Sequence, residues 1–179
     1  MLKITISAIE QYDEVLNEFI TSKEQSLYLE HSLVSLSKWE SKWLKPFLAK
    51  DEKTVEETID YIKCMTTTQN VDDKVYSSLT NNNIKEVTAY IDASMTATTF
   101  SKGKQAPNRE VITAEIIYYW MIALNIPFEC QKWHLNRLLT LINVCNLKNA
   151  PPKKMSRKET LSRNASMNAA RRQSLNSKG

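Results

Sequence analysis

The clearest structural signal in this chain of 179 residues is the run Thr54-Val55-Glu56-Glu57-Thr58-Ile59-Asp60-Tyr61-Ile62-Lys63-Cys64-Met65. Thr54 and Glu57 have the spacing of a capping box, in which the threonine oxygen accepts from the third helical amide and the glutamate reaches back. Apolar residues then recur at helical spacing, at Val55, Ile59, Ile62 and Met65. The run therefore predicts a helix over residues 55–65.

Helical spacing also continues before and after this run. Apolar residues follow it from Ser32 until Pro46 forces an end. Shorter helices are expected at about 72–79 and 84–92, and the run Asn81-Asn82-Asn83 can cap or turn before the second.

Two stronger helices are expected in the second half of the chain. The segment 109–124 is apolar nearly all round at its C-terminal end, so it should be the central buried helix. Pro127 separates it from a helix over 128–147, whose apolar residues lie largely on one side. Between 92 and 109, residues 94–100 are extended in character and 101–108 form a polar loop.

The N-terminus has a different period. Leu2, Ile4 and Ile6 alternate with polar residues, and the segments 18–21 and 26–30 have similar character. We expect a small sheet or hairpin within about residues 1–30, whose open edges could pair with another subunit. The predicted fold is mainly α: a helical domain over 1–150 with a small N-terminal β element and a basic C-terminal extension.

The extension, residues 151–179, carries eight lysines and arginines against one acid, a net charge of +7. Because the whole chain has a net charge of +4, residues 1–150 carry −3. Pro151-Pro152 predicts an extended linker, and Ser156 and Glu159 repeat the capping-box pattern. The only apolar stripe beyond is weak, at Leu161, Ala165, Ala169 and Leu175. We therefore expect a tail that is mobile when free and helical when docked.

Composition excludes several classes of function. Glycine occurs only at Gly103 and Gly179, which excludes the glycine-rich loops of Walker-type and dinucleotide sites. The N-terminus lacks the pattern of a secretory signal, and the longest apolar run, 116–128, is shorter than the roughly 20 residues of a membrane span. Three widely spaced cysteines, interpreted as buried thiols, suit a reducing cytoplasm: Cys64, Cys130 and Cys145.

Cys130 and His134 are the one local candidate for chemistry. They lie four residues apart on a predicted helix, which is the spacing of two metal ligands or of a nucleophile beside its base. Two ligands do not make a metal site, and the other histidine, His31, is about a hundred residues away in sequence. The prediction is a protein without catalytic, metal or cofactor residues, which is not an enzyme.

Residues that contact partners are predicted in two places. Trp39 and Trp43 share a helix face, either both in the core or with at least one as a partner anchor. The tail cations are expected to contact an acidic protein surface, including another copy's body, or nucleic acid without sequence preference. These cations are Lys153, Lys154, Arg157, Lys158, Arg163, Arg171 and Arg172. The tail has no aromatic residue for base stacking.

Four segments carry a family resemblance: Leu29-Glu30-His31-Ser32-Leu33-Val34-Ser35-Leu36-Ser37-Lys38-Trp39-Glu40-Ser41-Lys42-Trp43, Ile116-Ile117-Tyr118-Tyr119-Trp120-Met121-Ile122-Ala123-Leu124, Trp133-His134-Leu135-Asn136-Arg137-Leu138-Leu139 and Pro151-Pro152-Lys153-Lys154-Met155-Ser156. With them the chain resembles, over nearly its whole length, a group of small proteins of tailed bacteriophages, some described as tail assembly chaperones.

This resemblance implies a non-enzymatic protein of the infected bacterial cytoplasm. Such a protein would coat the long helical tape measure protein and help tail-tube subunits assemble around it, and it could self-associate. The alternative is a structural virion component, in the capsid, neck or tail, whose basic C-terminal tail ties neighbouring subunits together.

Overall fold

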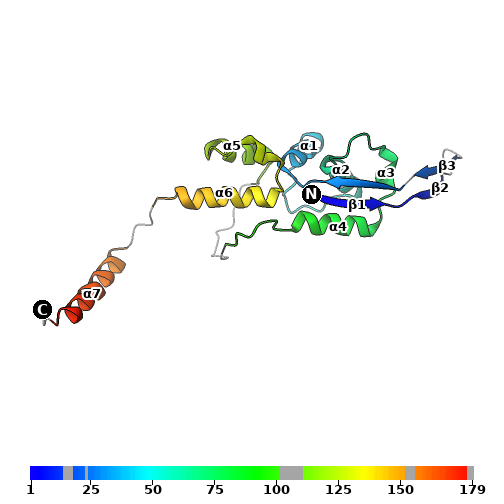
Figure 1. Cartoon of the computed structure of the whole chain (residues 1–179). Coiled ribbons are helices and arrows are strands. Elements are labelled where there is room, and N and C mark those ends of the chain that lie inside the picture. Colours follow the sequence, from blue (N-terminus) through cyan, green and yellow to red (C-terminus); the bar gives the residue numbers. More distant parts are fainter. Residues whose placement is uncertain (14–17, 23, 101–110, 152–155, 177–179) are drawn as a thin grey trace. The chain divides into compact units, whose positions relative to one another are not determined.

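The computed structural model describes residues 1–13, 18–22, 24–100, 111–151 and 156–176 (Figure 1). The chain divides into two compact units, Met1–Asn146 and Leu147–Gly179. The described part is mainly helical with a small N-terminal β element, as predicted.

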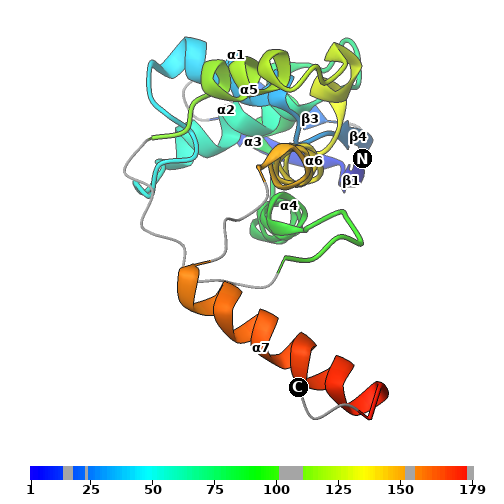
Figure 2. The same cartoon turned by 90° about the vertical axis from the view of Figure 1, so that its left-hand side faces the viewer.

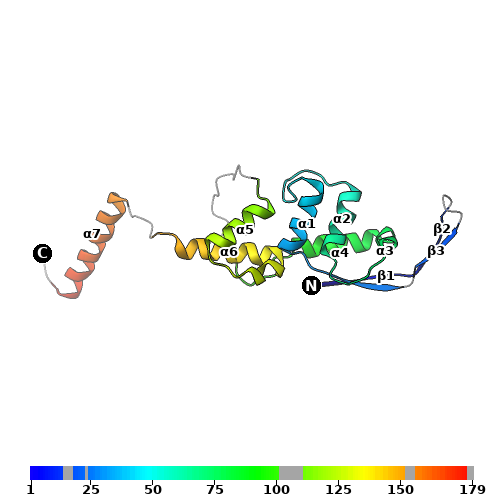
Figure 3. The same ribbon diagram turned by 90° about the horizontal axis from the view of Figure 1, so that it is seen from above.

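The β element is an antiparallel hairpin in two sections. Strand β1 (Leu2–Ile6) pairs with β4 (Gln25–Leu29), and β2 (Ile9–Asp13) pairs with β3 (Glu18–Ser22). Both sections keep one register, since Leu2 lies opposite Leu29 and Ile9 lies opposite Ser22. The β2–β3 pair therefore continues the β1–β4 pair (Figure 3). The strands at the N-terminus and near 18–21 and 26–30 are confirmed, and β2 was not predicted.

One face of the β1–β4 pair belongs to the core. Its buried residues are Ile4, Ile6, Leu27 and Leu29. Helix α4 (Asn81–Asp92) packs against β1, and the segment after residue 65 runs along β4. There the Glu30 amide donates to the Met65 carbonyl at 2.9 Å and the Thr67 amide to the Tyr28 carbonyl at 2.8 Å. The C-terminal end of this edge of β4 is thus paired within the chain, where an open edge was expected.

Helices α1 (Leu33–Trp43), α2 (Val55–Met65) and α3 (Asp73–Ser77) follow the hairpin. The capping box of α2 is present, since Thr54 Oγ1 accepts from the Glu57 amide and Glu57 accepts from the Thr54 amide. Helix α4 has a further capping box, Thr80 with Asn83, so the asparagine run lies inside the helix. Helix α1 ends at Leu44, before Pro46.

The last elements of the first unit differ from the sequence predictions. Helix α5 (Ala114–Ala123) is not the central buried helix, because one side of it is exposed. The predicted helix over 128–147 is broken into a 3₁₀ helix, η1 (Phe128–Lys132), and α6 (Leu135–Asn149). The break has a tertiary cause: Ser32 forms a β-bridge with His134, and the Leu135 amide donates to the His31 carbonyl at 2.7 Å.

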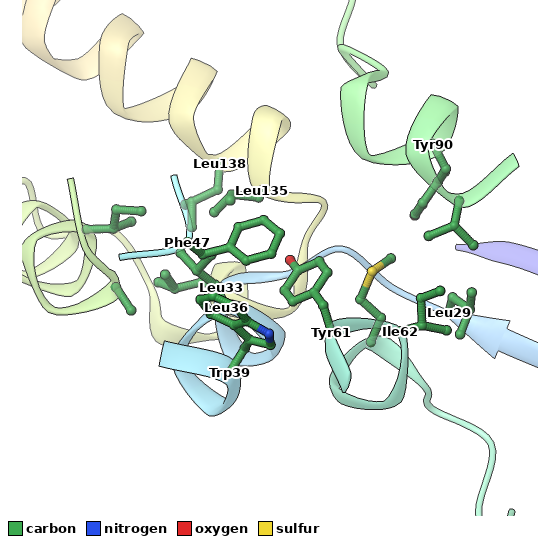
Figure 4. Packing of buried hydrophobic residues seen from close by; sticks show 14 of the residues in the cluster. Leu29, Leu33, Leu36, Trp39, Phe47, Tyr61, Ile62, Tyr90, Leu135 and Leu138 are labelled. Atoms are coloured by element: carbon green, nitrogen blue, oxygen red, sulfur yellow. The ribbon is translucent and has the colours of Figure 1, made fainter. Parts of the chain in front are cut away.

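The core joins side chains from distant parts of the sequence (Figure 4). Phe47, in the loop after α1, stacks on Tyr61 of α2 with ring centroids 3.8 Å apart. Trp39 meets Phe47 edge-on at 5.1 Å. Buried leucines from α1 and α6 surround these rings: Leu33, Leu36, Leu135 and Leu138. This cluster holds α1, α2 and α6 together.

The second unit contains helix α7 (Arg157–Ser174), shown in Figure 2. Its predicted capping box is present: Ser156 Oγ accepts from the Glu159 amide at 3.2 Å and Glu159 accepts from the Ser156 amide at 2.9 Å. None of the residues from 156 to 176 is buried. None of the described helices combines the length and the apolar composition needed to cross a bilayer.

Candidate protein-binding site

The two tryptophans singled out in the sequence have different environments. Trp39 is only 1% exposed, and its Nε1 donates to the Glu57 carbonyl at 2.9 Å. Trp39 therefore belongs to the core and has no exposed surface for a partner. Its prediction as a partner-binding residue is wrong. Trp43 is half-buried, and its ring stacks on that of Trp39 at 6.1 Å.

Trp43 is held in place by Asp60 on α2. Its Nε1 donates to Asp60 Oδ2 at 2.9 Å, and the Lys42 ammonium donates to Oδ1 of the same carboxylate. Burial opposes ionisation of Asp60, but the bonds from Lys42 and Trp43 outweigh it and lower the pKa of the carboxyl group. Asp60 thus stays ionised and fixes the indole ring.

Trp43 lines an open groove of about 620 Å³ between α1 and α2. We call it the Trp43 groove, and its residues are Lys42, Trp43, Val55, Glu56, Ile59, Asp60 and Lys63. Val55 is 72% exposed and Ile59 is half-buried, so the predicted apolar stripe of α2 is only partly covered by the core. A groove lined by apolar side chains and by charges of both signs is suited to binding a protein segment.

A further exposed apolar residue follows Trp43 at the end of α1. Leu44 is 86% exposed and ends α1 with φ of 53°, in the left-handed region that favours glycine. A non-glycine residue in this region is destabilised by roughly 1 kcal/mol. An exposed leucine therefore occupies a position where helix stability alone favours glycine.

A second apolar surface lies on α5. Its exposed residues have the spacing of one helix face, which we call the α5 face: Glu115, Tyr119, Ile122 and Ala123. Tyr119 is 66% exposed and Ile122 is 61% exposed. The opposite side is anchored in the core by Ala114, Ile117 and Met121. Helical spacing places these residues on two opposite sides of α5, but both sides are largely apolar in 114–123. The sequence therefore did not show which side is exposed.

The predicted tail cations fall into two groups. Lys153 and Lys154 lie outside the described residues. Five cations lie on the exposed surface of α7: Arg157, Lys158, Arg163, Arg171 and Arg172. Their role as partner contacts stays a prediction.

The two histidines, far apart in sequence, meet inside the first unit. The rings of His31 and His134 are 5.1 Å apart, and both are at most 5% exposed. His31 Nδ1 lies 2.5 Å from the Tyr61 hydroxyl. Burial, together with the proximity of His134, lowers the pKa of His31 to about 3.

His134 is held as the neutral Nε2–H tautomer. Its Nε2 donates to the Tyr90 carbonyl at 3.0 Å, while its Nδ1 accepts from the Asn136 amide at 3.3 Å. Burial lowers the pKa of His134 as well. Both rings therefore serve as neutral core groups.

The predicted pairing of Cys130 with His134 on one helix is wrong, since η1 ends before His134. Cys130 is buried as expected, whereas Cys64 and Cys145 are only half-buried. In the described ranges, no three His, Cys, Asp or Glu residues are grouped so that they could hold a metal ion.

No family model, curated protein or solved structure matches this chain in the three comparisons with known proteins.

Proposed function

We propose that this chain is a non-enzymatic protein of bacteriophage tail morphogenesis that acts in the host cytoplasm by binding other phage proteins. Its role would be that of a tail assembly chaperone, with the tape measure protein and the tail-tube subunits as partners. The proposal rests on the segments that resemble tailed-phage proteins and on the surfaces described above.

The Trp43 groove is the observation that carries the binding role. A rigid tryptophan, fixed by Asp60, lies beside two apolar side chains that the core leaves uncovered, Val55 and Ile59. Tryptophan is enriched among residues that dominate binding energy, and an amphipathic helix is a common occupant of such grooves. A long helical partner such as a tape measure protein supplies segments of this kind.

A structural virion component is the second candidate, because α7 is fully exposed and strongly basic. Peptide mass spectrometry separates the two roles. A chaperone is abundant in infected cells and missing from purified particles, whereas a virion component is present in particles at a stoichiometry that matches a capsid or tail symmetry.

The groove itself is tested by co-purification with the tape measure protein. Val55→Glu introduces a charge into the groove, and an acid in the first turn of α2 favours the helix dipole, so folding is preserved. We expect this variant to lose most of the co-purified partner. Tyr28→Ala, which truncates an exposed aromatic residue outside the groove, is the control. Equal recovery with both variants would reject the groove as the binding site.

A third possibility is nucleic-acid binding by the tail, which a measurement of affinity against salt concentration distinguishes from the other two. It requires a steep loss of affinity between low and physiological salt and depends on the α7 cations.

A further inference from the structure

Helix α7 has the composition of a helix that needs a partner. It runs for 18 residues without one buried side chain. Helix nucleation is costly, and most helices in proteins gain their stability by packing one face against a neighbour. The apolar stripe of α7 combines two leucines with two small alanines: Leu161, Ala165, Ala169 and Leu175. Five cations and one acid accompany it, a net charge of +4.

The α5 face is complementary to α7 in charge and in shape. Residues 113–131 include two acids, Glu115 and Glu129, and no lysine or arginine, and both acids are exposed. Tyr119 and Ile122 are large side chains that stand out from α5, whereas the alanines of α7 leave room for large neighbours. Large side chains facing small ones allow two helices to pack closely.

We propose that α7 of one copy packs against the α5 face of a second copy. The apolar stripe of α7 then covers Tyr119 and Ile122, and its cations lie near Glu115 and Glu129. Each copy carries both a donor helix and an acceptor face, so two copies can exchange helices reciprocally and further copies can join head-to-tail.

The chemistry of the two helices favours a second copy over a nucleic acid. A phosphate backbone would neutralise the α7 cations but would leave the apolar residues of both helices in water. Residues 1–150 carry a net charge of −3, so a second copy attracts the tail as well as offering an apolar surface. The inference holds whichever phage protein occupies the Trp43 groove.

The first test is the mass of the full-length chain in solution. Light scattering after size-exclusion chromatography should give a mass that rises with protein concentration above 20.6 kDa, the mass of one chain. Because the contact is partly electrostatic, the mass should fall back toward one chain as salt is raised from about 0.05 to about 0.5 M. A single chain at every concentration in low salt would overturn the proposal.

Charge exchange then identifies the two surfaces. One full-length variant reverses α7 with four substitutions: Arg157→Glu, Lys158→Glu, Arg171→Glu and Arg172→Glu. Its new N-terminal acids favour the helix dipole and its new C-terminal acids oppose it, so helix content should be nearly unchanged, which circular dichroism checks. The other variant reverses the acceptor with Glu115→Arg and Glu129→Arg.

Each variant alone should self-associate at least about tenfold more weakly than the unchanged chain, since like charges then face each other. Mixed together, the two variants should associate again, because the acidic α7 of one meets the basic α5 face of the other. A matched control, Lys38→Glu with Lys85→Glu, reverses two exposed cations on α1 and α4 and should leave association within about twofold. Failure of the mixture to associate, or equal weakening by the control, would reject this interface.

Discussion

Glu40 on α1 accepts a hydrogen bond from the amide of Ala114, the first residue of α5, at 2.7 Å between Oε2 and the nitrogen. Its other oxygen accepts from the Phe47 amide at 2.8 Å. Thr113, which precedes α5, makes no capping bond with its own side chain. One buried carboxylate therefore caps α5 from another helix and fixes the loop after α1.

Glu40→Gln should lower the free energy of unfolding by about 1–3 kcal/mol. The amide has a single acceptor oxygen, so one of the two backbone amides would face an NH₂ group. Urea denaturation measures the loss, and hydrogen exchange should show faster opening of the first turn of α5. Glu115→Gln, an exposed change in the same turn, is the control and should alter stability by less than about 0.5 kcal/mol. Equal effects would contradict the capping role.

The two tryptophans should separate stability from binding. Trp39→Phe removes the donor to the Glu57 carbonyl inside the core and should lower the free energy of unfolding by about 1–3 kcal/mol. Trp43→Ala should mainly reduce recovery of the partner, because its ring lines the open groove. Thermal melts and co-purification report the two effects. A Trp39→Phe protein with unchanged stability and poor binding would reverse this assignment.

The buried histidines should make folding sensitive to acid. Unfolded His31 binds a proton near pH 6.5, whereas the folded residue does so only near pH 3. Between these values the unfolded state holds the extra proton, so stability is present above about pH 6.5 and declines as the pH falls. One such group contributes a slope of up to about 1.4 kcal/mol per pH unit.

Denaturation of His31→Gln over the same pH range isolates this contribution. The amide of glutamine can still bond to the Tyr61 hydroxyl but does not titrate. We expect a shallower decline in stability between pH 6.5 and 4 than in the unchanged chain. Two parallel curves would show that His31 is not the acid-sensitive group.

Leu44→Gly should raise the free energy of unfolding by about 0.5–1 kcal/mol, because glycine adopts the left-handed conformation at the end of α1 without steric penalty. If the exposed leucine contacts a partner, the same variant should bind that partner more weakly. Chemical denaturation and co-purification give the two readings. A less stable variant would mean that the Leu44 side chain contributes to folding.

Local sequence signals predicted several elements well. The pair Thr54 and Glu57 and the pair Ser156 and Glu159 both form capping boxes, because such boxes depend only on residues three positions apart. The alternation of Leu2, Ile4 and Ile6 likewise predicted a strand with one buried face. The Trp43 groove was predicted only in part. Trp43 was named as a partner-binding residue from its helical spacing, whereas Val55 was assigned to the apolar stripe of α2.

Other features depend on contacts between distant residues. The helix over 128–147 was predicted to be unbroken because no residue near position 134 in the sequence indicates the β-bridge between His134 and Ser32. The apolar composition of α5 predicted full burial, yet packing covers only the side that meets α1 and leaves Tyr119 exposed. His31 and His134 lie about a hundred residues apart in sequence, and the fold brings their rings together.

By itself, then, the sequence determined the capped starts of α2 and α7, the N-terminal strands and the division between a slightly acidic body and a basic tail, because capping, alternation and charge act over a few residues. Only the tertiary structure decided which apolar side chains are covered: Trp39 lies inside and Trp43 in a groove, although both belong to one helix face. The physical reason is that burial depends on which elements pack together, and this is a property of the whole chain.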